Sequence, residues 1–433
     1  MKLRNVRWYI AGLLFASTVI NYIDRQTLSV VAPVLTKDLN ISPTEYAAIL
    51  QAFLIAYTIM YVLSGPLVDR WGTKVSLAVF VAWWSASNAL HMFARTPFQL
   101  AAFRFMLGVG EPGNYNAAAR IASEWYPPKE RAFINGLVNA GSALGAIIAT
   151  PLVAWLTIAY GWRFAFVATG ALGFVWLAFW LFFYHLPAKH PFITAGELAQ
   201  LQAVQASESL VPQESWARLW GRRDVWGLLL ARFLSDPVWW FYLFWMPKYL
   251  VEQRSFTLVE IGLIAWLPYL TADMGAIAGG WISGRLLGPG RTTLQARYIP
   301  MAVSAFVMPA SIGIAYTSSS SVAVALISLV TCCHQIWKTN LMTITNDIYP
   351  VASVGSVAGI VSLGSGVGGV LFMNATGRIV EAVSYDWMFI IMGFLHPVAF
   401  LVCRLMVPAA PAAGPSTGDP EPVSSFLNPQ APR

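Results

Sequence analysis

Charged residues are scarce in this sequence. Lys, Arg, Asp and Glu make up 11% of the 433 residues, and 57% of the residues are hydrophobic. Soluble globular proteins contain about 25% charged residues. A chain this apolar would precipitate from water, so the composition excludes an ordinary soluble enzyme or binding domain.

Cysteine and the common catalytic motifs are also scarce or missing. The three cysteines, Cys332, Cys333 and Cys403, fall in apolar segments without the spacing of a metal site or a disulfide framework. The sequence has no GxxxxGK[ST] phosphate-binding loop and no HExxH metal motif. These absences argue against an ATP-driven or catalytic membrane protein, and we expect neither a cofactor nor a metal.

The apolar residues are concentrated in long segments. Each segment is close to the roughly 20 residues that a helix needs to cross a bilayer. The segments lack the in-out alternation of barrel strands. We therefore expect an all-α membrane protein with about twelve transmembrane helices, near residues 8–36, 44–68, 75–93, 98–125, 132–158, 164–184, 225–250, 258–287, 298–316, 322–349, 354–380 and 387–407.

Basic residues gather in alternate joints between these segments, and such joints face the cytoplasm under the positive-inside rule. The net charge of +7 is therefore attributed to membrane topology, and no nucleic-acid partner is expected. The first segment is not a cleaved signal, because the polar stretch NYIDR interrupts it. Both termini are predicted to be cytoplasmic, on the side of Lys2, Arg4, Arg7, Arg70, Lys74, Lys129, Arg131, Lys189, Arg218, Arg222, Arg223, Arg285, Arg291 and Arg297.

The two halves of the chain repeat one pattern. Glu124, Tyr126, Pro127, Gly136, Gly141 and Gly145 are matched at a constant offset by Asp347, Tyr349, Pro350, Gly359, Gly364 and Gly368. Internal repeats of this kind are typical of transporters. We predict a six-helix bundle at residues 1–185, a cytoplasmic linker at 186–224, a second bundle at 225–407, and a disordered cytoplasmic tail at 408–433.

The stretch GPLVDRWGTK, residues 65–74, lies in the joint between the second and third expected helices. It resembles the signature of the major facilitator superfamily. Its glycines permit a tight turn and close helix contact, and Asp69 with Arg70 and Lys74 can form charge pairs that hold the cytoplasmic face shut. The alternative is a solvated loop whose basic residues only set topology. We assign the gate to Gly65, Asp69, Arg70, Gly72, Lys74 and Arg131.

Four ionisable residues lie deep in the first half. Asp24 and Arg25 are near the middle of the first segment, and Arg104 and Glu111 face the same side of the fourth, because they are seven residues apart. Buried ionisable groups in a membrane helix indicate a substrate or ion pathway. We expect two carboxylate–arginine pairs that can exchange a partner for a proton or an anion. A static buried ion pair is the alternative.

NYIDR and RFMLGVGEPGNYNAA resemble the anion:cation symporter family within that superfamily. The resemblance implies that Asp24 and Glu111 take up protons, that Arg104 tunes Glu111, and that Arg25 receives the substrate carboxylate. It also places Tyr22 and Tyr57 near the substrate.

DPVWWFYLFWMPKYL, LPYLTADMGAIAGG and CCHQIWKTNLMTITND resemble the bacterial hexuronate transporters. The repeat offset places His334 at the position of Glu111, with a packed histidine as the alternative. Aromatic rings and amides near the tenth helix suit a polyol, although Trp239 and Trp337 could instead be packing residues, and Asp236 and Asp273 are further candidates. We assign the sugar-reading site to Trp239, Tyr242, His334, Gln335, Trp337 and Asn340.

From these residues we expect a proton-coupled symporter of a sugar-acid anion, most simply a hexuronate of the glucuronate or galacturonate class. Its partners would be protons and the lipid bilayer, and it would act as a monomer in the bacterial inner membrane by alternating access. Carriers of aldonates, aldarates or other organic anions are the nearest alternatives. A polytopic membrane enzyme or receptor is the remote one.

Overall fold

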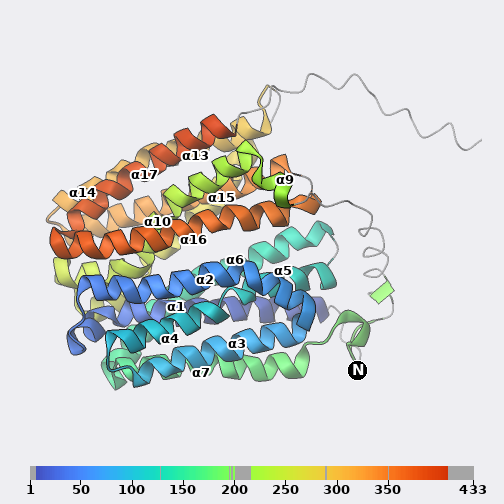
Figure 1. The fold of residues 1–433 in the computed structure, drawn as a ribbon, viewed down its shortest axis with the longest axis horizontal. Coiled ribbons are helices and arrows are strands. Elements are labelled where there is room, and N and C mark those ends of the chain that lie inside the picture. Colours follow the sequence, from blue (N-terminus) through green and yellow to red (C-terminus); the bar gives the residue numbers. More distant parts are fainter. Residues whose placement is uncertain are drawn as a thin grey trace, which may run out of the picture.

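The computed structural model describes residues 6–126, 128–194, 196, 198–199, 216–287, 290–349 and 351–407. Within these residues the chain is helical and contains no strand. Figure 1 shows two groups of helices side by side, with α1 to α7 in one and α10 to α17 in the other. The expected all-α fold of two bundles is confirmed. The expected tail at 408–433 and part of the linker lie outside the described residues.

The first bundle contains six spanning segments, two of which are interrupted. A 3₁₀ turn, η1, extends α3, and a two-residue break separates α4 from α5. The bounds are α1 (Val6–Asp38), α2 (Pro43–Trp71), α3 (Thr73–Leu90) with η1 (His91–Phe93), α4 (Pro97–Gly110) with α5 (Gly113–Trp125), α6 (Pro128–Tyr160) and α7 (Trp162–Phe183).

The second bundle repeats this arrangement after the short elements η2 (Pro187–Lys189) and α9 (Trp216–Trp220). Its six segments are α10 (Arg223–Arg254), α11 (Leu258–Ile264) with α12 (Leu267–Leu286), α13 (Thr293–Val307) with η3 (Met308–Ser311) and α14 (Ile312–Tyr316), α15 (Ser320–Ile348), α16 (Val351–Ala382) and α17 (Tyr385–Met406). The described residues therefore form the twelve expected segments. Nine of them meet a length and hydropathy criterion for crossing a membrane.

The outer surface of the bundles is apolar. Large hydrophobic side chains are strongly exposed on several helices, with Phe182 83% exposed and Ile277 75% exposed. In water such a surface would be an aggregation hazard, whereas in a bilayer it faces lipid tails. Helices whose backbone groups are bonded internally are the structures that such a solvent permits. The chain is a multi-pass membrane protein.

The repeated glycines have the same surroundings in both halves. A Cβ atom on Gly145 of α6 would lie 2.5 Å from the carbonyl oxygen of Val19 on α1. A Cβ atom on its counterpart Gly368 of α16 would collide in the same way with the carbonyl oxygen of Phe233 on α10. A Cβ atom on Gly136 would have no neighbour within 4 Å. The repeat read from the sequence therefore corresponds to one helix pair, built twice.

Gly145→Ala is expected to destabilise the protein, because its methyl group would collide with the backbone of α1. The expected loss is about 1–3 kcal/mol, typical of overpacking. Gly136→Ala is the matched control, in the same helix but with open space. It should be neutral or stabilising by up to about 1 kcal/mol, since alanine favours the helix. Unfolding curves of both variants in detergent check the difference, and equal stabilities would contradict the close contact.

The two bundles are joined at the end where α2 begins. There the backbone N–H of Thr44 donates to the Glu381 carboxylate at 2.9 Å, and the Tyr46 hydroxyl donates to the carbonyl of Phe244 at 2.9 Å. Among the described residues, no hydrogen bond or ion pair links α2 beyond Thr58 to the second bundle. Figure 1 shows the bundles diverging toward the opposite end, which also holds the N-terminus.

Candidate functional site

Arg25 on α1 lies in an aromatic cage built by α1 and α2 of the first bundle. Its guanidinium carbon is 4.5 Å from the ring centroid of Tyr22 and 4.8 Å from that of Tyr57. Phe53 adds a third ring at 5.5 Å. Arg25 is 1% exposed. Aromatic faces stabilise a desolvated cation, so the cage holds a buried charged group. Tyr22 and Tyr57, which the family resemblance places near the substrate, are two of its three rings.

Glu111 is the ion-pair partner of Arg25. Its Oε2 atom accepts from Nε of Arg25 at 2.7 Å, and Nη2 of Arg25 lies 2.6 Å from the same oxygen. Glu111 is fully buried, and its Oε1 atom has no hydrogen-bond partner. One carboxylate oxygen thus holds the arginine while the other remains available to a proton.

A break in the fourth segment places Glu111 in this position. The helix α4 ends at Gly110, and α5 begins at Gly113. Pro112 has no N–H to continue the helical ladder. The carbonyl of Glu111 accepts from the backbone N–H of Asn114 at 3.2 Å and from the side-chain amide of Asn21 at 3.5 Å. The break therefore ties the backbone of Glu111 to α1, one turn before Arg25.

The pairing expected from the sequence was wrong. Among the described residues, Asp24 forms no ion pair with Arg25, and Arg104 forms none with Glu111. Instead Arg25 crosses to Glu111, and Nη2 of Arg104 donates to the backbone carbonyl of Arg25 at 2.8 Å. Arg104 is fully buried, with its Nε and Nη1 atoms lacking hydrogen-bond partners. It therefore adds a second buried positive charge close to the Arg25–Glu111 pair.

Asp24 faces another side of α1, toward α3 and α7. Its Oδ1 atom accepts from the amide of Asn88 at 2.6 Å, and the same amide donates to the hydroxyl of Thr169 at 2.8 Å. Asp24 is fully buried, and its Oδ2 atom has no hydrogen-bond partner among the described residues. Asn88 and Thr169 were missed in the sequence, although a single asparagine in an apolar segment is a signal of this kind.

A second group of predicted residues meets in the other bundle. The ring of His334 stacks on Trp239, with centroids 5.6 Å apart and planes at 11°. Its Nδ1 atom lies 3.1 Å from Nε2 of His396 on α17. The Nζ atom of Lys338 lies 6.0 Å from the Trp239 ring centroid. His334 is thus a packed, hydrogen-bonded histidine whose partner His396 was not foreseen.

A cavity with an empty volume of about 240 Å³ is lined by members of both groups, the residues around Arg25 and the residues around His334. The first bundle supplies Tyr22 and Ser142 to its wall, and the second supplies Trp239, Asp273 and Gln335. Tyr22 also forms one side of the Arg25 cage. Aromatic faces beside a carboxylate, an amide and a hydroxyl form a mixed wall suited to a polyol.

Of the six residues assigned to the sugar-reading site, four do not line this cavity, namely His334, Tyr242, Trp337 and Asn340. Trp337 is fully buried and packs on Phe400 in the core of the second bundle. Tyr242 packs on Phe389, and the amide of Asn340 donates to the carbonyl of Gly279 at 3.2 Å. These contacts are those of packing residues in this conformation.

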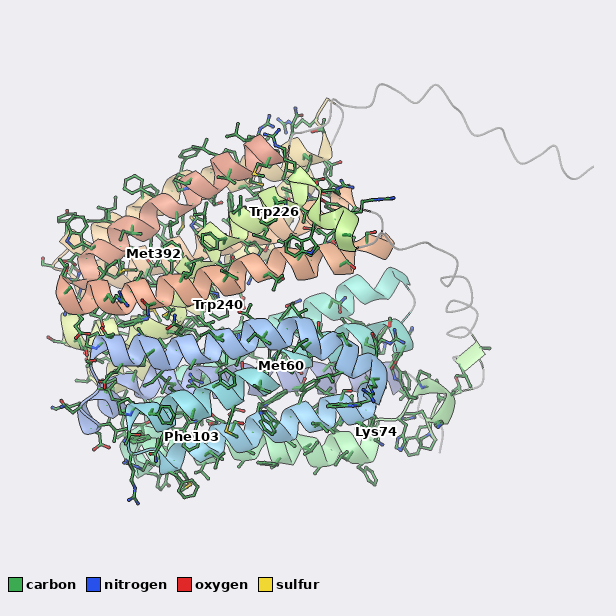
Figure 2. The ribbon with its side chains drawn as sticks, in the orientation of Figure 1. Met60, Lys74, Phe103, Trp226, Trp240 and Met392 are labelled. Carbon is green, nitrogen blue, oxygen red and sulfur yellow. The ribbon has the colours of Figure 1, made fainter. Side chains whose placement is uncertain are left out.

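The predicted gate lies at the diverging end of the molecule, where Figure 2 labels Lys74. Gly72 has a φ of 77° in the turn between α2 and α3, a conformation that favours glycine. Asp69 pairs with Arg120 of α5 at 3.8 Å, and among the described residues neither Arg70 nor Lys74 forms an ion pair with it. Gly65 has no neighbour within 4 Å of a Cβ position. The side chain of Arg131 lies outside the described part.

Asp69→Asn is expected to slow transport without changing which substrate binds. The Asp69–Arg120 pair is exposed, 67% and 55% respectively, so its loss should change stability by about 1 kcal/mol or less. Turnover should fall because the charges at this end bias the closing of the bundles. Initial rates and binding affinities for several sugar acids check this. A selective change in affinity at normal turnover would contradict the gating role.

Comparison with known proteins places the chain in a family. The model of the Major Facilitator Superfamily matches residues 14–372. The hexuronate transporter of Escherichia coli K12 is 30% identical over 430 residues, covering 97% of this chain and 99% of that protein. A probable galactarate/D-glucarate transporter of the same organism, GarP, is 28% identical over 422 residues, covering 93% and 95%.

Solved structures share the fold. The xylose transporter XylE from E. coli, in an inward-open conformation, superimposes with a TM-score of 0.71 at 13% identity, over 94% of this chain and 97% of that one. The resemblance inferred from the motifs is confirmed, and the chain is a transporter and not an enzyme. It belongs to the Major Facilitator Superfamily.

Proposed function

We propose that this protein is a proton-coupled symporter that imports a hexuronate by alternating access. The observation that supports it best is the buried pair of Arg25 and Glu111, caged by aromatic rings of α1 and α2. The similarity to a hexuronate transporter over nearly the whole chain supports the substrate class. The bacterial inner membrane, two cytoplasmic termini and a monomeric state are parts of the same proposal.

Competition for Arg25 couples the substrate to a proton at this pair. A substrate carboxylate that binds Arg25 competes with the Glu111 carboxylate, since both use the same guanidinium donors. Two ionised carboxylates at one guanidinium would also repel each other in a buried site. Uptake of one proton by Glu111 removes both the competition and the repulsion. The substrate thus binds when Glu111 is protonated, and release of that proton returns Glu111 to Arg25.

Asp24 and Arg104 act on the same proton exchange. Among the described residues Asp24 has an amide partner and no ion-pair partner, so a proton would remove a buried charge that has no ion-pair partner. Arg104 places a positive charge next to the pair and opposes protonation of Glu111. The two residues set the conditions under which Glu111 exchanges its proton, and Asp24 is a second group able to bind a proton in the same one-proton exchange.

The sugar ring occupies the cavity beside Tyr22. Trp239 offers an aromatic face, and Gln335, Asp273 and Ser142 offer hydrogen-bonding groups. With cytoplasmic termini, the diverging end of the bundles faces the cytoplasm, so this conformation is the inward-facing one. Separation of Thr44 from Glu381 and approach of the α2–α3 turn to the second bundle would convert it to the outward-facing one.

Uptake by the purified protein in liposomes tests the proposal. With a proton gradient directed into the liposomes, glucuronate or galacturonate should accumulate inside above the outside concentration. The accumulation should vanish when a protonophore collapses the gradient. Empty liposomes and liposomes with the Arg25→Gln variant are the controls. Absence of uptake of any sugar acid by folded protein would overturn the proposal.

A further inference from the structure

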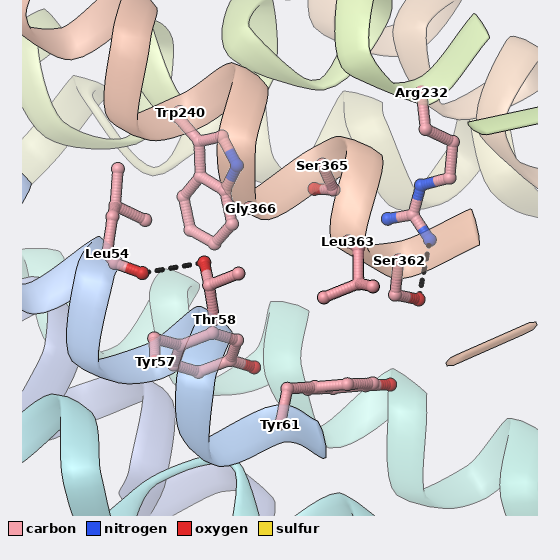
Figure 3. A pocket seen from close by; sticks show the side chains of 10 residues that line it. All are labelled: Leu54, Tyr57, Thr58, Tyr61, Arg232, Trp240, Ser362, Leu363, Ser365 and Gly366. Atoms are coloured by element: carbon pink, nitrogen blue, oxygen red, sulfur yellow. Dashed lines mark hydrogen bonds between the residues drawn. The ribbon is translucent and has the colours of Figure 1, made fainter. Parts of the chain in front are cut away.

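A second cavity lies between α2, α10 and α16, and the mechanism above does not use it. Its empty volume is about 430 Å³ (Figure 3). At one end of the cavity, Thr58 of α2 packs on Gly366 of α16 and the two bundles are in contact. Tyr61 and Ser362 lie about one helical turn farther toward the diverging end.

Arg232 lines this cavity with the arm of its guanidinium that does not bond Asp236. Its Nε and Nη2 atoms donate to Oδ2 of Asp236 at 2.9 and 2.5 Å. This pairing fixes the plane of the guanidinium, and Nη1 donates to the hydroxyl of Ser362 (Figure 3) and to the sulfur of Met342, each at 3.3 Å. Arg232 is 8% exposed. Asp236 therefore holds a nearly buried arginine with a donor directed at the cavity.

The remaining polar groups on the wall can also donate hydrogen bonds. The hydroxyl groups of Ser362, Ser365 and Tyr61 lie on the same wall. Together with the guanidinium of Arg232 they offer hydrogen-bond donors to a ligand. The wall suits a ligand rich in acceptors and negatively charged.

Tyr57 connects this cavity with the central site. Its ring centroid is 4.8 Å from the guanidinium carbon of Arg25, and Tyr57 also lines the second cavity. A ligand held by one carboxylate at Arg25 can extend past Tyr57. Arg25 lies against the ring of Tyr57, Arg232 lines the same cavity as Tyr57, and each arginine is held by its own carboxylate.

We propose that Arg232 binds the second carboxylate of a dicarboxylic sugar acid, an aldarate, while Arg25 binds the first. This rests on the proposed role of Arg25 and extends the substrate range from hexuronates to aldarates. A hexuronate has no second carboxylate, and its ring occupies the cavity beside Tyr22, whose wall does not include Arg232. Arg232 is thus a specificity-determining residue for a second carboxylate.

The test compares the affinities of purified protein for glucarate and glucuronate by calorimetry. The double variant Arg232→Gln, Asp236→Asn removes both charges together, so that no buried charge is left unpaired. Loss of a charged hydrogen bond should weaken glucarate binding by about tenfold or more relative to glucuronate. Because both affinities are measured on the same sample, their ratio does not depend on how much of the protein is folded. Arg232→Lys should give a smaller shift, because it keeps the charge without the fork.

A matched control removes an exposed pair at the other end of the molecule, Arg163 and Asp38, as Arg163→Gln with Asp38→Asn. It should leave the ratio of the two affinities as in the wild type. Wild-type protein that binds glucuronate and not glucarate would overturn this inference alone, as would a double variant that weakens both ligands equally. Wild-type protein that binds neither acid would overturn the proposed function as well.

Discussion

Glu111→Gln is expected to abolish accumulation driven by a pH gradient while leaving substrate binding and exchange in place. Glutamine resembles the protonated acid but cannot release a proton. A symporter that moves one anion with one proton accumulates its substrate about tenfold for each unit of pH difference, since one unit corresponds to about 1.4 kcal/mol. The variant should reach only the outside concentration. Time courses of labelled glucuronate in liposomes, with counterflow as the control for binding, measure both properties.

The same variant should bind substrate without dependence on pH. In the wild-type protein the ionised Glu111 competes with the substrate for Arg25, so affinity should fall as pH rises. Glutamine carries no charge at any pH and cannot compete in this way. Affinities measured across a pH series check the difference. Wild-type accumulation by Glu111→Gln would show that Glu111 is a static partner of Arg25 and would leave Asp24 as the coupling group.

Arg25→Lys is expected to weaken hexuronate binding by about tenfold to a hundredfold. Lysine keeps the positive charge, but it lacks the planar fork that meets a carboxylate with two hydrogen bonds. It also stacks less well between Tyr22 and Tyr57 than a guanidinium does. The loss corresponds to a charged hydrogen bond, about 1.5–3 kcal/mol. Titration calorimetry on the folded variant measures it.

The control for Arg25→Lys is the same exchange at Arg163, which pairs with Asp38 at the surface and is 43% exposed. Exposed ion pairs contribute little, so Arg163→Lys should bind as the wild type does. Wild-type affinity in folded Arg25→Lys would remove Arg25 as the carboxylate-binding residue.

The spans and the repeat could be predicted from the sequence because both depend on local composition. Long apolar runs predict helices in lipid whatever their neighbours are. The repeated glycines predicted that the two halves share one packing, and Gly145 and Gly368 meet their neighbouring helices in the same way. The group around Arg25 was also predictable in part, because buried charges in membrane helices have few other roles.

The choice of partner between helices could not be predicted. Arg25 follows Asp24 directly in the chain, yet adjacent helical residues point about 100° apart. Arg25 therefore faces α4 while Asp24 faces Asn88. Asp69 meets Arg120 on another helix for a similar reason. These pairs depend on the rotation of each helix about its axis, which packing between helices decides.

Helical geometry alone argues against the prediction that Gln335 and Trp337 face the same site. Gln335 and Trp337 are two residues apart on α15, so they point about 200° apart and could not both face one cavity. Gln335 lines the cavity, and Trp337 is buried against Phe400. Arg232 was missed although it lies one helical turn before Asp236, which had been named as a candidate. His396 was missed because its partner His334 lies on another helix.

Proton movement coupled to sugar-acid entry tests the central proposal most directly. Wild-type protein is placed in liposomes with a pH-sensitive dye inside, at equal pH on both sides, and glucuronate is added outside. The lumen should acidify at a rate that follows the entry of labelled glucuronate, and Glu111→Gln liposomes should show no acidification. Glucuronate entry without acidification in the wild-type protein would contradict proton coupling.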